Sequence, residues 1–288
     1  MRTTLRLPLR QIQEYLATMH GVRVSVGELV ELLHGVRKEG QELLEGLRAE
    51  MRHSALLHMD ETGWREDGEN GYVWVCSTGG AEAVRYYEYD RRRSQVVVQR
   101  LLGAQFRGVL STDFYAGYNR YLGPHQRCWV HLLRDLHELK EEHARQAEVV
   151  QWAEKVRQLY EDAQSFVQAI PAPGEAQREQ QYLSLLQRLQ PLGLAYASQK
   201  HPCQALAKRL LRHQDELFQF VLLDDIPADN NLAERSLRPL IVSRKISGGT
   251  RSSEGSKTRM GLASLFGTWQ ARGLNPFHQC LALLAQSP

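Results

Sequence analysis

The stretches "ALLHMDET" (residues 55–62), "GYVWVCSTGG" (71–80) and "AVRYYEYDRRRS" (83–94) decide the fold. The first is a short apolar run that ends in acid, the second is rich in aromatic and β-branched residues, and the third alternates apolar with polar side chains. Glycine-rich turns separate them. We therefore expect three strands of an antiparallel meander, with Asp60 closing the first strand.

The chain then continues this pattern with one helix and two more strands. "SQVVVQRLLGAQF" (94–106) predicts a helix, "GVLSTDF" (108–114) a buried fourth strand and "HQRCWVH" (125–131) a fifth. The order of elements is βββαββ, which predicts an α/β fold with a mixed sheet.

A long polar region from residue 132 to 223 has helical periodicity and cannot belong to the same sheet. We expect "IPAPGE" (170–175) and Pro191 to break its helices. The predicted organisation is a helical module at 1–50, a catalytic domain formed by 51–131 and 224–288, and a helical subdomain at 132–223 inserted before the last catalytic helix. A glycine- and serine-rich turn (247–257) and a closing helix (258–273) end the domain.

The sequence of the amino-terminal module predicts two short helices between residues 7 and 36. The first ends at Gly21, and the second begins with a capping box at residues 25–28. The pair resembles a helix-turn-helix, whose second helix would enter a DNA groove. That helix carries Glu28 and Glu31 near its start, where base-reading side chains belong, so a plain packing module is the alternative.

Composition bounds the class of protein. The 288 residues are 42% hydrophobic and 24% charged, without a signal peptide or an apolar run of membrane-spanning length, so we expect a cytoplasmic globular protein. The four cysteines form no C-x-x-C pair, which argues against a structural zinc site or a disulfide framework. Between residues 229 and 272, eight basic side chains face three acidic ones, a local surplus of five that suits a polyanion.

Three acids are candidates for chemistry. Asp60 and Asp113 close the first and fourth strands, and parallel neighbours would bring both carboxylates to one edge of the sheet. A buried carboxylate stays ionised only beside a cation or hydrogen-bond donors, and Mg²⁺ prefers such oxygen ligands. Glu234, in "IPADNNLAERSLRPL" (226–240), can be the third ligand. Taken singly, Asp60 could cap a turn, Asp113 could form an Asx-turn, and Glu234 could complete a capping box with Asn231.

The segments "HMDETGWREDGENGYVWV", "STDFYAGYNRY", "CWVHLLRDL" and "DNNLAERSLRPLIVSRKISGG" together resemble transposases of the insertion-sequence-66 type, a branch of the DDE transposases. The similarity extends over nearly the whole chain from Leu7. It implies a ribonuclease-H-like βββαββα core in which Asp60, Asp113 and Glu234 are the catalytic triad and bind two Mg²⁺ or Mn²⁺ ions.

The resemblance also implies the substrate, which is the end of a mobile DNA element. Metal-dependent cleavage and strand transfer would act on double-stranded DNA, both element ends and target, within at least a homodimer. Phosphate contacts are expected from five basic residues on and after the glutamate helix: Arg235, Arg238, Arg244, Lys245 and Arg251. We also expect Pro239 to end or kink that helix.

Other readings stay open. Longer members of the family carry an amino-terminal cysteine-rich zinc element, so this chain could be a compact member, one product of a split gene or a truncated copy. A metal-dependent nuclease of the same superfamily is a rival, although the helical insertion speaks against those compact enzymes. A transposase-derived DNA-binding protein is another, and the intact acids disfavour it. A zinc hydrolase built on His58 and Asp60 lacks a second ligand pair.

Overall fold

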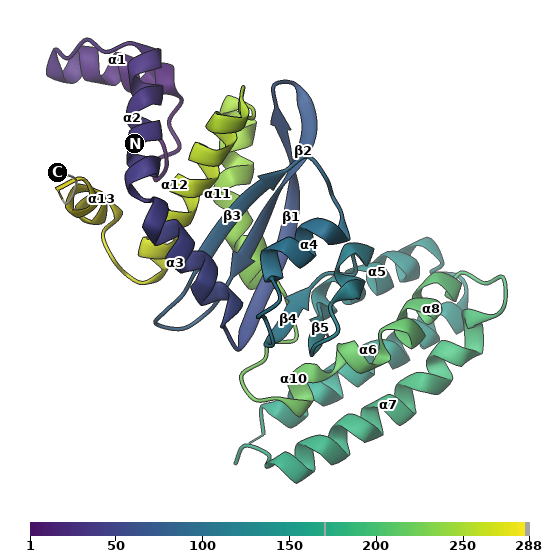
Figure 1. The fold of residues 1–288 in the computed structure, drawn as a ribbon. Coiled ribbons are helices and arrows are strands. Elements are labelled where there is room, and N and C mark those ends of the chain that lie inside the picture. The colour runs from purple at the N-terminus through teal and green to yellow at the C-terminus, as the bar shows by residue number, and fades with distance from the viewer. Residues whose placement is uncertain (170, 286–288) are drawn as a thin grey trace. The chain divides into compact units, whose positions relative to one another are not determined.

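The protein is a mixed α/β structure with a five-stranded mixed sheet, as expected for a ribonuclease-H-like transposase (Figure 1). The computed structural model describes residues 1–169 and 171–285. The strands are β1 (Leu56–Glu66), β2 (Glu69–Ser77), β3 (Arg85–Asp90), β4 (Val109–Thr112) and β5 (His125–Arg127).

Helices make up most of the remaining chain. The first group precedes or interrupts the sheet: α1 (Leu9–His20), α2 (Val26–Glu39), α3 (Gln41–Arg52), α4 (Gln95–Leu102) and the 3₁₀ turn η1 (Ala116–Arg120). The second group follows β5: α5 (Trp129–Glu142), α6 (Ala147–Val167), α7 (Glu175–Ala197), α8 (Gln204–Arg212), α9 (Gln214–Leu217) and α10 (Gln219–Leu222). The last group closes the chain: α11 (Asn231–Ser247), α12 (Ser253–Ala271) and α13 (Pro276–Ala285). Among the described residues, no helix combines the length and the apolar character needed to cross a membrane.

The chain divides into two compact units. The first contains Met1–Gly108 and the chain from Asn231 onward, and the second is Val109–Asn230. The first unit holds the meander β1, β2 and β3 with α1 to α4 and α11 to α13. The second unit holds β4, β5 and α5 to α10. The assignment of a catalytic domain with an inserted helical subdomain stays a prediction.

The predicted meander is present, with antiparallel pairing of β1 with β2 and of β2 with β3. Its first strand is longer than expected. Asp60 was expected to close that strand, yet β1 continues for six residues beyond it, to Glu66. The reason is the turn that follows, where Asp67 and Gly68 both have positive φ (52° and 82°). Asp-Gly with this geometry forms the tight two-residue hairpin loop that matches strand twist, so pairing extends up to the turn.

The core of the first unit lies between the meander and two helices that cover the same face (Figure 1). It consists of apolar side chains from β1, β2 and β3 against those of α11 and α12: Trp64, Val73, Val75, Tyr87, Ala233, Leu237, Leu240, Met260 and Ala263. Burial of this apolar area is the main force holding α11 and α12 against the strands.

Helix α12 also covers the outer edge of β3. The backbone N–H of Arg85 donates to Thr268 Oγ1 at 2.9 Å, and the N–H of Tyr87 donates to Ser264 Oγ at 2.8 Å. Thr268 and Ser264 are one helical turn apart, so their hydroxyls follow the spacing of alternate strand residues. An unpaired strand edge invites association with other chains, and these side chains block it.

The amino-terminal helices form as predicted. Gly21 ends α1 with a left-handed conformation (φ 65°), and Ser25 with Glu28 forms a complete capping box at the start of α2. Helices α2 and α3 then pack on α12, and His34 Nδ1 lies 2.6 Å from Thr258 Oγ1.

In the second unit, β4 and β5 pair in parallel, and the helices form a core of their own. Figure 1 shows α6 and α7 lying side by side in this unit. The expected fifth strand is shorter than "HQRCWVH", because the helix α5 starts at Trp129. Trp129 is fully buried, and its indole N–H donates to the carbonyl of Leu217 at 2.5 Å.

Two prolines do not end their helices: the expectation that Pro191 breaks a helix is wrong, and of the two outcomes expected for Pro239, an end or a kink, the end does not occur. Pro191 lies inside α7, and Pro239 lies inside α11. Each is exposed, so the backbone carbonyl that loses its partner can bond to water. Both helices bury leucines near the proline, Leu185 and Leu189 in α7 and Leu237 and Leu240 in α11. This packing outweighs the cost of the backbone hydrogen bond that the proline removes.

Candidate active site

Asp60 and Glu61 are adjacent in β1 and face opposite sides of the meander. Asp60 lies opposite Val75 in the strand pairing, and Glu61 lies opposite Trp74. Val75 packs in the core beneath α11, so Asp60 occupies the α11 face of the strand. Because successive side chains of a strand point to opposite faces of the sheet, the two acids lie on different sides of it.

Glu61 is engaged in an ion pair. Its side chain is 1% exposed, and two nitrogens of Arg93 reach its Oε1, at 2.6 and 2.7 Å. The charge of Glu61 thus has a cationic partner within its own unit. Asp60, which is half-buried, accepts the backbone N–H of Glu61 at 2.8 Å through Oδ1. Of the two acids, Asp60 is the one that faces the helix carrying Glu234.

Glu234 is half-buried in the first part of α11. The helix begins at Asn231, which puts Glu234 at the fourth helical position, one beyond the place of a capping-box glutamate. Ala233 and Leu237 on the same helix lie in the core with Val75, the strand partner of Asp60. Asp60 and Glu234 therefore stand on two elements that pack against each other within one core.

Helix α11 runs beside β1 in the same direction, and hydrogen bonds fix this alignment. Near the start of the helix, Ser236 Oγ lies 2.9 Å from Ser77 Oγ. Near its end, Arg244 donates to the carbonyl of Gly63 and, at 3.4 Å, to Thr62 Oγ1. These anchors hold the helix in register with the strand.

The glycine-serine turn after α11 locks this arrangement. The N–H of Thr250 donates to the carbonyl of Arg65 at 2.8 Å, forming a short parallel bridge beside the end of β1. A Cβ on Gly249 would stand 1.8 Å from that carbonyl oxygen, so only glycine fits. Trp64 donates its indole N–H to Thr250 Oγ1 at 3.1 Å.

Asp113 follows β4 directly, as predicted. Its Oδ1 accepts the backbone N–H of Tyr115 at 2.9 Å, which is the Asx-turn considered above as the alternative role. The turn orients the carboxyl group at the strand end. Gly117 leaves room for the ring of Tyr115, since a Cβ there would lie 2.3 Å from a ring carbon. Tyr118, fully buried, packs edge-on against that ring.

A fully buried arginine holds the loop that carries Asp113. Arg127, at the end of β5, donates to the backbone carbonyl of Asp113 at 2.8 Å and to Asn119 Oδ1 at 2.7 Å. Its Nε forms an ion pair with Glu216 at 2.5 Å. Arg127 therefore ties the start of the loop and the turn η1 within it to the second unit's interior.

Two histidines complete the surroundings of Glu216. His213 Nδ1 lies 3.0 Å from the carboxylate, and His125 Nδ1 lies 3.8 Å from it. Burial acts to raise the pKa of Glu216, but the hydrogen bond from His213, the nearby His125 and the charge and hydrogen bond of Arg127 together outweigh burial and lower the pKa to about 2. Burial, with the charge of Arg127 added, holds the pKa of His125 well below its usual value. His125 is consequently neutral, and its Nε2 lies 2.8 Å from Thr112 Oγ1.

The five basic residues expected to contact phosphates differ in their surroundings. Arg235, Arg238, Lys245 and Arg251 are exposed, whereas Arg244 is half-buried and engaged with β1. Sequence reasoning missed Arg127 and Glu216 as residues that position Asp113. Only the position of Arg127 in the predicted fifth strand hinted at burial, and nothing in the sequence paired it with a glutamate so far along the chain.

The comparison with known proteins decides the family. The model of the transposase IS66 family matches residues 2–258. The chain belongs to this family. Two relatives from Sinorhizobium fredii are the uncharacterized proteins y4jO and y4qI. The first is 32% identical over 170 residues, which is 59% of this chain and 50% of the relative. The second is 24% identical over 310 residues, covering 97% of this chain and 57% of the relative. This IS66-family chain thus spans about half the length of the curated relatives it matches.

Proposed function

We propose that the protein is a DNA transposase that cleaves and joins the ends of an insertion sequence, with Asp60, Asp113 and Glu234 as the ligands of two divalent ions, Mg²⁺ or Mn²⁺. Membership of the transposase IS66 family supports the type of activity. The observation that carries the residue assignment is the placement of Asp60 and Glu234 on the packed pair β1 and α11, while Glu61 is held by Arg93.

The donor set fits the proposed ions. Three carboxylates offer hard oxygen ligands and leave positions open for substrate phosphate oxygens, as Mg²⁺ requires. Bound divalent ions supply Lewis acidity toward the phosphodiester and the attacking hydroxyl. The chain's own part is to hold its carboxylates in position. The strand fixes Asp60, and the Asx-turn with Arg127 fixes Asp113.

The same three acids serve two reactions under this proposal. Water would attack first and free a 3′-hydroxyl, and that hydroxyl would then attack target DNA in an equivalent in-line displacement. No covalent bond between DNA and protein is needed. The protein would act in the cytoplasm on nucleoid DNA, and pairing of two element ends calls for at least a homodimer.

Basic side chains on α11 and beyond would hold the flanking phosphates. Arg235 and Arg238 project from the exposed surface of the helix that carries Glu234, and Lys245 and Arg251 follow. Arg244 contributes by anchoring α11 to β1 through Gly63.

A strand-transfer assay with a pre-cleaved 3′-OH end and Mg²⁺ tests the assignment. Asp60→Asn, Asp113→Asn and Glu234→Gln should each lower joining by about 10³-fold or more, because each removes a charge that holds the ions in the transition state. Glu69→Gln, an exposed acid of the same hairpin, is the matched control and should keep full activity.

Joining by the triple variant at the rate of the unsubstituted protein would disprove the three-acid assignment. Two other outcomes identify the rivals. DNA binding without any metal-dependent chemistry in the unsubstituted protein would point to a transposase-derived DNA-binding protein. Hydrolysis without joining would point to a nuclease.

A further inference from the structure

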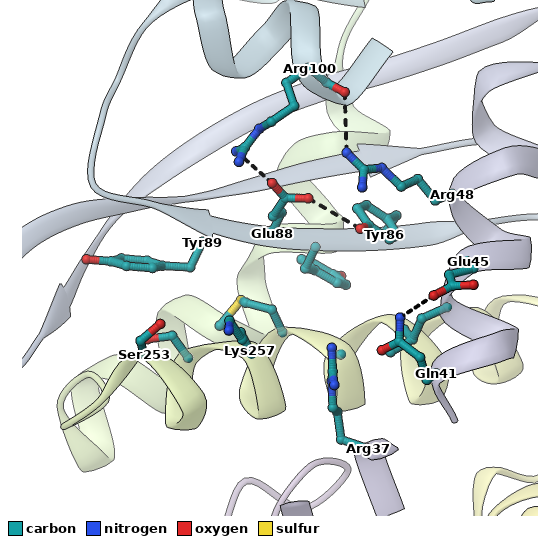
Figure 2. A pocket seen from close by; sticks show the side chains of 15 residues that line it. Arg37, Gln41, Glu45, Arg48, Tyr86, Glu88, Tyr89, Arg100, Ser253 and Lys257 are labelled. Carbon is teal, nitrogen blue, oxygen red and sulfur yellow. Dashed lines mark hydrogen bonds and ion pairs between the residues drawn. The ribbon is translucent and has the colours of Figure 1, made fainter. Parts of the chain in front are cut away.

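A pocket of about 380 Å³ lies in the first unit, away from Asp60, at the outer edge of the meander (Figure 2). Its walls come from the α2–α3 junction, β3, α4 and the first turns of α12. β2 separates β3 from β1, so the pocket is two strand spacings, roughly 10 Å, from the strand of Asp60.

The charges that line the pocket are not balanced. Four cationic side chains (Arg37, Arg48, Arg100 and Lys257) face two acidic ones (Glu45 and Glu88). Arg100 is neutralised, because it pairs with Glu88 at 2.6 Å and with Asp90 at 2.8 Å. Glu88 also accepts the hydroxyl of Tyr86, as Figure 2 shows. The remaining positive charge belongs to Arg37, Arg48 and Lys257, opposed only by the exposed Glu45.

Arg37 is held in place without an acceptor. A Cβ on Gly261 would stand 2.9 Å from Cγ of Arg37, so the bare glycine leaves a channel for the arginine stem. Nε of Arg37 is shut off from solvent and has no hydrogen-bond partner among the described residues. Arg48 is similar, because its Nη2 donates to the carbonyl of Arg100 at 3.4 Å while its buried Nε lacks an acceptor there.

Arg37 lines the pocket without an acid partner, and its terminal nitrogens, unlike Nε, are not shut off from solvent, so an anion that enters the pocket can reach them. Lys257 also lines the pocket, on α12 one helical turn before Gly261, and forms no ion pair with any residue that the structure describes. Guanidinium groups together with an ammonium group are the chemistry that recognises phosphate.

We propose that this pocket binds a backbone phosphate of DNA, with Arg37, Arg48 and Lys257 as its ligands. The inference rests on the proposed function for the choice of DNA. Lys257 belongs to the basic surplus between residues 229 and 272, a composition that suits a polyanion. The volume exceeds that of a phosphate group and leaves room for the attached sugar, beside the ring of Tyr89.

Fluorescence anisotropy with a labelled DNA duplex, without divalent metal and over a series of salt concentrations, tests the proposal on the full chain. Arg37→Gln and Lys257→Gln should each weaken binding by about 3- to 10-fold and reduce the slope of log K against log salt by about 0.9, the value for one lost phosphate contact. Lys38→Gln is the matched control, since Lys38 is the exposed neighbour of Arg37 and does not line the pocket. Arg37→Lys should retain part of the affinity.

Arg37→Gln and Lys257→Gln variants that bind like Lys38→Gln would overturn the proposal and leave the strand-transfer assignment untouched. Conversely, loss of duplex affinity in these two variants, with no strand joining by the unsubstituted protein, would keep the pocket and remove the enzymatic function. A mononucleotide that raises the melting temperature in an Arg37-dependent way, with duplex binding unchanged, would show a small phosphate ligand and also overturn the DNA assignment.

Discussion

Arg127 in the second unit and Arg37 in the first are both withdrawn from solvent, but their surroundings differ. Arg127 is fully buried, and each of its three guanidinium nitrogens has an acceptor: Glu216, the carbonyl of Asp113 and Asn119. Arg37 is half-buried, and its Nε has none among the described residues.

This difference in hydrogen-bond partners indicates two roles for an arginine side chain, one in holding the structure and one in binding a ligand. A buried cation whose donors are all satisfied holds its neighbours in one arrangement, because breaking any bond leaves a charge without compensation. A cation that lines a cavity without an acid partner gains from an incoming anion. Arg127 is on this basis a residue that positions Asp113, and Arg37 is a ligand-binding residue.

The largest expected effect follows from removal of Arg127. Arg127→Gln leaves Glu216 partly buried without its cation and should lower the free energy of unfolding by about 3 to 5 kcal/mol. Urea unfolding monitored by circular dichroism measures it. Arg134→Gln, an exposed arginine of α5, is the control and should change stability by less than about 0.5 kcal/mol. Equal small effects in both variants would contradict the positioning role.

A pH dependence of intermediate size should come from the same cluster. The folded pKa values of His125 and Glu216 both lie below their ordinary values, so each stabilises the fold when deprotonated. Both groups make their full contribution to the free energy of unfolding above about pH 6.5. Below that pH the contribution of His125 is lost, because the unfolded chain takes up a proton there more readily than the folded one. From pH 4.5 toward 2 the contribution of Glu216, up to about 3 kcal/mol, is lost as its carboxyl group protonates.

Urea unfolding at a series of pH values checks this expectation. Glu216→Gln should flatten the part of the profile below pH 4.5 and leave the part near pH 6 in place. A profile that is unchanged by the substitution would show that Glu216 is not the titrating group.

The smallest expected effect on stability is that of Arg37. Arg37→Gln should change the free energy of unfolding by no more than about 0.5 kcal/mol in phosphate-free buffer, since no ion pair is lost. Differential scanning calorimetry of the variant beside Lys38→Gln measures this. A loss as large as that expected for Arg127→Gln would mean that Arg37 is structural, and the contrast between the two arginines would disappear.

Much of the fold could be predicted from sequence because local patterns determine it. The aromatic and β-branched content of residues 71–77 and the alternation in residues 85–90 predict strands, and Ser25 with Glu28 predicts the start of α2; all three are present. The position of Asp113 directly after β4 also follows from its apolar run. The placement of Asp60 at a strand end was wrong, because the Asp67-Gly68 turn that extends β1 was not recognised.

Other features depend on partners far away in the chain. Pro191 and Pro239 lie inside helices, because core packing outweighs the local cost of a proline. The joint assignment of Asp60, Asp113 and Glu234 as metal ligands stays a prediction that the strand-transfer experiment tests.

The sequence by itself determined the family, the order of strands and helices, and three candidate acids, since composition, periodicity and motifs are properties of neighbouring residues. Only the tertiary structure decided which side chains have their charges satisfied. Glu61 pairs with Arg93 and Arg127 with Glu216, whereas Arg37 faces a pocket. Whether a buried charge is compensated depends on groups brought close by folding, and that proximity is what gives otherwise identical residue types different roles.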